Sequence, residues 1–187
     1  MTEIRKLFSY EPEDLAVLND VASAAYMARD FERAAKIYRA LTVIEPDFAE
    51  AHNNLGMVFR ETGKDNKALT SFRKAVALKP DYAEARWAVV MSQLPAICTP
   101  DRTPEKCRSG FSLELAKLER WFETNRPPQP SKVVGSQQPF FLAYQEENNR
   151  DLLSRYGVLS TRLMADWQIM QNLGPRKNTA GGKIKVG

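Results

Sequence analysis

The sequence contains one histidine and two cysteines, so it is poor in the residues that most often bind zinc or act in catalysis. A single histidine excludes a site built on two histidines, and Cys98 and Cys107 have no zinc-binding spacing. Glycine-rich phosphate loops and the G-x-S-x-G nucleophile motif are also absent. We interpret His52 as a packing residue and Cys107 as a buried, inert thiol. The sequence therefore indicates no catalytic residue, no metal site and no cofactor.

Long hydrophobic runs are missing as well. No run approaches the roughly 18 residues that a membrane-spanning helix requires. The N-terminal sequence MTEIRKLFSYEPED lacks the continuous apolar core of a signal peptide. In a chain without an export signal the two cysteines are expected to stay reduced rather than to form a disulfide. The sequence therefore predicts a cytoplasmic protein with no membrane partner.

A charge excess is absent from the body of the chain. The formal net charge is +4, and four basic residues with no acid fall within residues 175–187. The rest of the chain carries 23 basic and 23 acidic side chains. Nucleic-acid-binding proteins instead carry a basic patch on the folded domain. The sequence therefore predicts no nucleic-acid partner.

What the sequence does contain is an internal repeat. PDFAEA at 46–51 returns as PDYAEA at 80–85, an offset of 34 residues, which is the period of the tetratricopeptide repeat. Each repeat of that type is a pair of helices, and small residues are needed where the two helices cross. The residues expected at these crossings and beside them are Gly56, Ala68 and Phe72 in the central repeat and Ala22, Ala34 and Tyr38 in the first. Val21 takes the apolar position that Leu55 holds in the central repeat.

A third repeat begins at Ala83 with a predicted helix over 83–94 and then departs from the pattern. Prolines at 95, 100 and 104 delay its second helix, which is expected to begin at Pro104 after the N-cap residue Thr103. Apolar residues at helical spacing predict the buried face of this capping helix: Cys107, Phe111, Leu115, Leu118 and Phe122.

The rest of the chain predicts a connector and one more helix. We expect a leader at 1–14, the solenoid at 15–123, a proline-rich connector at 124–139, a helical segment at 140–174 and a basic tail at 175–187. FFLAY at 140–144 should be buried, and a helix over 149–172 should pack through Leu152, Tyr156, Leu159, Leu163, Trp167 and Met170. The predicted fold is all-α, a right-handed superhelix of two clear repeats and a degenerate third, followed by this helical connector.

Several segments together resemble a bacterial protein family. The repeats, ARWAVVMSQLP, FSLELAKLERWF, VGSQQPFFLAYQEENNRDLLSRYG and the final KIKVG resemble O-linked N-acetylglucosamine transferase-like proteins of SPINDLY type. In that family a tetratricopeptide solenoid precedes a two-lobed glycosyltransferase, and by similarity KIKVG would be the first strand of the first lobe. The family's sugar-nucleotide site and catalytic residues lie beyond that strand, so the resemblance assigns no catalytic residue here.

The resemblance also implies a binding groove. Position 6 of each repeat lies on the concave surface and holds Asp20, Asn54 and Ala88. An asparagine there in the resembled family helps to hold the backbone of an extended polypeptide, since a carboxamide both donates and accepts. Only Asn54 matches; Asp20 could accept from a peptide N–H, and Ala88 can do neither. Other residues expected to line the groove are Asn53, Met57, Arg60 and Glu61.

Two functions remain open at this point. In the leading interpretation the chain recruits protein substrates for a glycosyltransferase-like protein that modifies protein hydroxyls from a UDP-sugar, and the catalytic region follows Gly187. In the alternative, the chain is a stand-alone adaptor that binds proteins or associates with itself through exposed repeat faces. Both predict a protein or an extended peptide in the concave groove.

Overall fold

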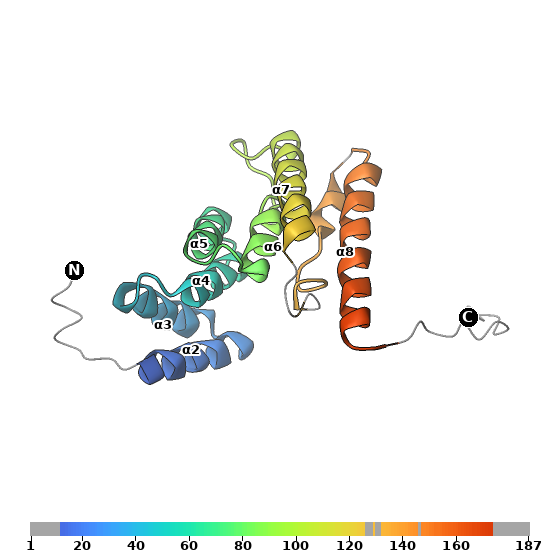
Figure 1. The fold of residues 1–187 in the computed structure, drawn as a ribbon. Coiled ribbons are helices and arrows are strands. Elements are labelled where there is room, and N and C mark those ends of the chain that lie inside the picture. Colours follow the sequence, from blue (N-terminus) through green and yellow to red (C-terminus); the bar gives the residue numbers. More distant parts are fainter. Residues whose placement is uncertain (1–11, 126–128, 130–131, 146, 174–187) are drawn as a thin grey trace, which may run out of the picture.

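The computed structural model describes residues 12–125, 129, 132–145 and 147–173. These residues form α-helices and one 3-10 helix and contain no β-strand. Each α-helix packs against the next one along the chain, and Figure 1 shows them stacked in that order. The elements are α2 (Pro12–Met27), α3 (Phe31–Ile44), α4 (Ala49–Glu61), α5 (Asp65–Leu78), α6 (Ala83–Met91), α7 (Pro104–Thr124), the 3-10 helix η2 (Phe140–Tyr144) and α8 (Arg150–Met170).

Local signals in the sequence set the ends of several helices. The Asp30 side chain accepts a hydrogen bond from the Arg33 backbone N–H at 3.1 Å and so caps α3. At the start of α7, Thr103 accepts in the same way from the Lys106 N–H at 3.5 Å. Gly63 joins α4 to α5 with a φ of +69°, a conformation that glycine adopts without steric cost. These turns bring consecutive helices back against each other.

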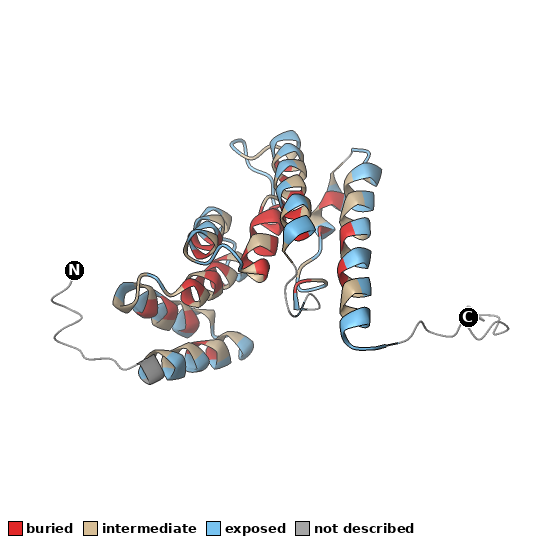
Figure 2. Ribbon diagram, in the orientation of Figure 1, coloured by how far each residue is buried: buried red, intermediate tan, exposed pale blue. Residues whose placement is uncertain are grey.

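The first two repeats share one hydrophobic core, and Figure 2 shows its buried residues along the packed sides of α3 and α4. A Cβ atom added at Gly56 would lie only 2.6 Å from the Phe72 ring, so no side chain fits at this crossing. Val21 is 37% exposed, whereas its counterpart Leu55 is buried, so its assignment to a packed position is wrong. The reason is that no described helix precedes α2 to cover that face. The predicted crossing residues that are buried here are Ala22, Ala34, Tyr38, Gly56, Ala68 and Phe72.

The third repeat begins as predicted, but its first helix is shorter than expected. α6 ends at Met91, whereas the sequence predicted a helix to residue 94. The last backbone hydrogen bonds follow a 3-10 pattern, as from the Leu94 N–H to the Met91 carbonyl. The reason is that Pro95 disfavours the α conformation at the residue before it. The Arg102 guanidinium then donates to the Ser92 carbonyl at 2.7 Å and holds the loop that leads to α7.

The C-terminal helices form a second core around Trp87 of α6. The Trp87 ring lies 5.6 Å from that of Tyr156 on α8, so the third repeat and the last helix pack directly together. Arg155 on α8 binds Glu119 on α7 through two nitrogens, at 2.6 and 3.2 Å. Val133, from the connector, is also fully buried in this core. The largest other members of the core are Met91, Leu94, Phe111, Leu115, Leu118, Phe122, Leu142, Leu159 and Leu163.

Two predictions of burial near the C-terminus are wrong in part. Within η2 only Leu142 is buried, while Phe140 is 60% and Tyr144 is 72% exposed. A 3-10 turn repeats every three residues, so it directs about one side chain in three toward the core. On α8 the predicted face holds through Leu163, but Met170 is 54% exposed. The last turns of α8 extend beyond the end of α7, as Figure 1 shows.

Other predictions fall outside the described residues. These are the leader before residue 12, the Gly174-Pro175 end of the last helix, the basic tail at 175–187 and the KIKVG strand. Each described helix is either too short or too polar to span a lipid bilayer.

Candidate functional site

A cavity of about 300 Å³, here called the groove cavity, opens between α2, α4 and the connector. Its walls combine residues of the first two repeats with residues 132–137, which are far away in the sequence. It is lined by Ser23, Tyr26, Met27, Tyr38, Asn53, Asn54, Met57, Glu84, Lys132, Ser136 and Gln137.

The structure brings three of the predicted groove residues together in this cavity: Asn53, Asn54 and Met57. Asp20 and Arg60 are not among the lining residues. Asp20 is exposed on α2, and Arg60 pairs with its neighbour Glu61 at 3.4 Å.

A line of side-chain amides joins α2 to α4 along the cavity wall. Asn54 donates to the Asn19 side-chain oxygen at 3.2 Å, and Asn53 donates to the Asn54 oxygen at 3.4 Å. The Oδ1 atom of Asn53 is buried and has no hydrogen-bond partner among the described residues. This oxygen is enclosed by protein atoms, so Asn53 lines the cavity with other parts of its side chain.

Tyrosine hydroxyls supply further polar groups. Tyr38 and Ser23 share a hydrogen bond of 2.9 Å between their hydroxyl oxygens. Burial is the main cause that raises the pKa of both Tyr26 and Tyr38, so both hydroxyls are neutral at physiological pH. Glu84 and Lys132 add one charge of each sign to the lining. The lining residues therefore carry no net charge, and their polar groups are set in a surface that is mostly apolar.

The connector closes one side of the cavity through contacts that the sequence did not predict. The Trp87 indole N–H donates to the backbone carbonyl of Gln137 at 3.1 Å. The Gln137 side-chain nitrogen lies 3.6 Å from the Met57 sulfur, and its Oε1 atom is buried without a partner among the described residues. An indole on the first helix of a repeat thus holds a polypeptide backbone carbonyl.

Sequence reasoning missed the residues that α2 contributes to the site. In the first repeat it singled out Asp20 at position 6, whereas Asn19 at position 5 joins the amide line and Ser23 at position 9 lines the cavity. The available signal was the asparagine that recurs at position 5, with the next lining residue four positions later on the same helix face.

The cavity offers amide, hydroxyl, thioether, carboxylate and ammonium groups, and its lining contains no cysteine or histidine. Within the described part of the chain, no three side chains of histidine, cysteine, aspartate or glutamate form a group able to hold a metal ion.

Comparison with known proteins identifies the repeat type of these helices. Residues 19–83 match the family model of the tetratricopeptide repeat. The fold is a tetratricopeptide-repeat solenoid. This confirms the predicted fold class and its repeat pattern, because the matched residues span α2 to α5, where the crossings are packed as the pattern requires.

Curated relatives share part of the chain. Peroxisomal targeting signal receptors of Eremothecium gossypii and Candida albicans are 26% and 25% identical to it, over 73 and 128 residues. These alignments cover 39% and 68% of this chain but only 13% and 21% of the receptors. The chain thus spans about a fifth or less of the length of these relatives.

Solved structures share the repeat fold at low identity. The CopN-Scc3 complex contains a chain that aligns with a TM-score of 0.56 at 15% identity, covering 76% of this chain and 75% of that one. The type III secretion translocator chaperone SycD of Yersinia enterocolitica aligns with a TM-score of 0.53 at 12% identity, covering 85% and 89%. Both similarities extend the solenoid likeness beyond the residues that match the family model.

Proposed function

We propose that the groove cavity binds an extended polypeptide of a partner protein. The observation that carries this proposal is the line of side-chain amides from Asn19 through Asn54 to Asn53. Asn53 and Asn54 both line the cavity of about 300 Å³. A peptide backbone supplies N–H donors and carbonyl acceptors at regular intervals, and side-chain amides can pair with both whatever the peptide's sequence.

The chain's own connector supports this chemistry. Trp87 donates to the Gln137 backbone carbonyl from the same side of the solenoid, so one polypeptide segment is already held there by a backbone contact. A partner peptide in the groove cavity would lie next to this segment and extend its line of backbone contacts toward α2.

The relatives are consistent with a protein ligand. Two of them are named as receptors for a targeting signal, and one structural neighbour is named as a chaperone. By analogy, the ligand of this chain is a segment of another protein. We keep the cytoplasm as its proposed compartment because both cysteines are free thiols.

The test begins with selection of a random-peptide library on the purified chain, followed by affinity measurement for the tightest peptide. Replacing Asn54 with alanine breaks the amide line from Asn19 to Asn53 and removes one carboxamide from the lining. We expect the peptide to bind about tenfold more weakly, as loss of one or two hydrogen bonds implies.

The control is Asn66→Ala, which removes the same side chain from an exposed position of α5 that does not line the groove cavity. It should leave the affinity unchanged. Equal affinities for wild type and Asn54→Ala would reject the groove as the site. A mass of the chain alone that rises with concentration in light scattering would instead favour the self-associating adaptor.

A second candidate function is recruitment of substrates for a glycosyltransferase. It rests on the resemblance of residues 134–149, and the relatives and structures named above give it no support. Its one structural argument is that this segment is built into the fold: Leu142 is fully buried, and the Asn149 side chain donates to the Leu142 carbonyl at 2.7 Å.

Intact-mass analysis of the native gene product tests this candidate. A substrate-recruiting arm predicts a product two to three times heavier than 21.2 kDa, as two added lobes of ordinary size imply. A product of 21.2 kDa would exclude attached catalytic lobes and favour the stand-alone adaptor.

A further inference from the structure

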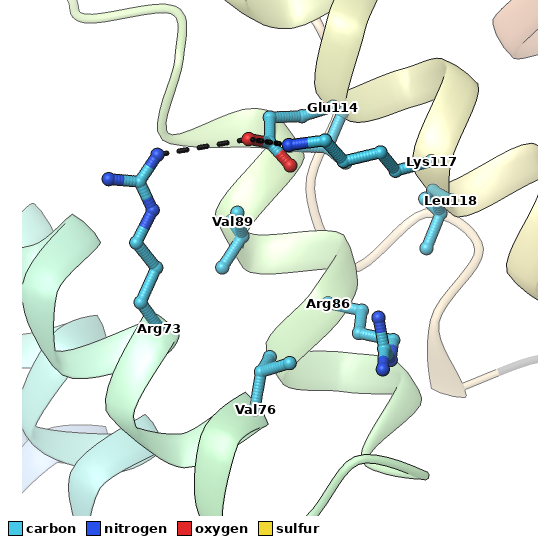
Figure 3. A pocket seen from close by; sticks show the side chains of 8 residues that line it. Arg73, Val76, Arg86, Val89, Glu114, Lys117 and Leu118 are labelled. Carbon is cyan, nitrogen blue, oxygen red and sulfur yellow. Dashed lines mark hydrogen bonds and ion pairs between the residues drawn. The ribbon is translucent and has the colours of Figure 1, made fainter.

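A second cavity, of about 210 Å³, lies between α5, α6 and α7 and shares no lining residue with the groove cavity. Figure 3 shows apolar side chains on its walls, with Val76 from α5, Val89 from α6 and Leu118 from α7. Val89 and Leu118 are themselves buried. The volume is several times the roughly 30 Å³ that one water molecule occupies, so a side chain of a ligand could enter.

Basic side chains dominate the charged part of this cavity. Arg73, Arg86 and Lys117 line it together with a single acid, Glu114. Glu114 lies 3.0 Å from the Lys117 nitrogen and 3.8 Å from the nearest Arg73 nitrogen, as the dashed lines in Figure 3 mark. One carboxylate thus forms ion pairs with two cations, and the lining residues carry a net charge of two positive charges.

Arg86 is the cation that Glu114 does not neutralise. Its Nε donates to the Pro80 carbonyl at 2.7 Å, and its guanidinium lies 4.9 Å from the centre of the Trp121 ring. These two contacts fix the group, but no carboxylate among the described residues pairs with it. Burial lowers the pKa of Arg86, and no neighbouring charge offsets this effect. A fixed, partly desolvated guanidinium with unused N–H groups is a strong binder of carboxylate.

We propose that this cavity binds an acidic segment of a partner protein, with an apolar side chain against Val76 and Val89 and a carboxylate on Arg86. The apolar walls favour this ligand over a free anion such as phosphate. Sites for phosphate commonly use backbone N–H groups at a helix start or in a nest. The lining residues from α6 begin at Arg86, one turn beyond the helix start at Ala83.

The test uses a fluorescein-labelled octapeptide in which two leucines alternate with two glutamates, titrated with the full chain. Glu114→Gln removes the one acid and frees Arg73 and Lys117, so the peptide should bind about three- to tenfold more tightly. A gain in affinity is not expected from a damaged fold. The matched control, Glu123→Gln, neutralises an exposed acid on α7 outside the cavity and should change the affinity little.

Loss of the guanidinium gives the opposite result. Arg86→Gln should weaken binding about tenfold, since it removes a charge-assisted hydrogen bond. A twin peptide with glutamine in place of glutamate, and another with serine in place of leucine, should each bind more weakly to the wild-type chain. Absence of measurable peptide binding to Glu114→Gln, or equal affinities of Glu114→Gln and wild type, would overturn the proposal.

Competition with inorganic phosphate distinguishes a site for an acidic peptide from a site for a free anion. At constant ionic strength, phosphate should displace the octapeptide only weakly. If phosphate displaces it fully and the leucine-free peptide binds as well as the parent, the cavity is a simple anion site and the proposal fails.

Discussion

Replacing Gly56 with leucine is expected to lower the free energy of unfolding by about 3 kcal/mol or more. The reason is geometric, because even a Cβ atom at this position would lie 2.6 to 3.0 Å from three atoms of the Phe72 ring. Phe72 is fully buried and cannot move aside without displacing the rest of the repeat core. In a chain of this size the melting temperature should fall by roughly 10 °C, measured by circular dichroism.

Gly157 on α8 provides the matched control. A Cβ added there would meet nothing within 4 Å, so Gly157→Ala should be neutral or stabilise by up to about 1 kcal/mol through helix propensity. A Gly56→Leu variant that melts with the wild type would mean that α4 and α5 do not cross at Gly56.

The second large effect is expected at Trp87, the largest fully buried side chain among the described residues. Trp87→Ala would leave a cavity where α6, α8 and the connector meet, and truncations of this kind cost about 3 to 5 kcal/mol. Urea unfolding followed by circular dichroism should show the loss. We also expect α8 to detach first, with early proteolysis of the connector in this variant.

Trp87→Phe separates the hydrogen bond from the packing. Phenylalanine keeps an aromatic ring near Tyr156 but cannot donate to the Gln137 carbonyl, so about 1 kcal/mol should be lost for that bond, plus a smaller packing cost. If alanine and phenylalanine cost the same small amount, Trp87 does not hold the C-terminal helices to the solenoid.

The repeats could be predicted from the sequence because their packing is local and periodic. Crossing residues such as Gly56 and Ala68 recur at fixed offsets, and the buried face of α7 follows from helical spacing alone. The end of α6 was missed because a proline acts on the residues before it, and Leu94 lies too close to Pro95 to continue an α-helix.

The candidate site could be predicted only in part. Asn53, Asn54 and Met57 follow from the repeat register, whereas the connector wall depends on a contact between Trp87 and Gln137, 50 residues apart. No local pattern encodes such a contact. The exposed Phe140 and Tyr144 show the same limit, because hydrophobicity alone could not tell which side of η2 would face the core.

The site between α5, α6 and α7 was missed for a related reason. The sequence has balanced charges over residues 1–174, and only the fold gathers Arg73, Arg86 and Lys117 around a single acid. Balanced composition excludes a basic protein body, but it does not exclude a basic cavity.

The most direct test of the groove is to map where the selected peptide binds, by nuclear magnetic resonance of the isotope-labelled chain. We predict that the largest shifts will fall on the side-chain amides of Asn53 and Asn54 and on the Trp87 indole N–H, while Asn66 stays unchanged. A peptide that bound tightly but shifted none of the three, with its largest effects elsewhere on the solenoid, would contradict the assignment of this cavity as the polypeptide site.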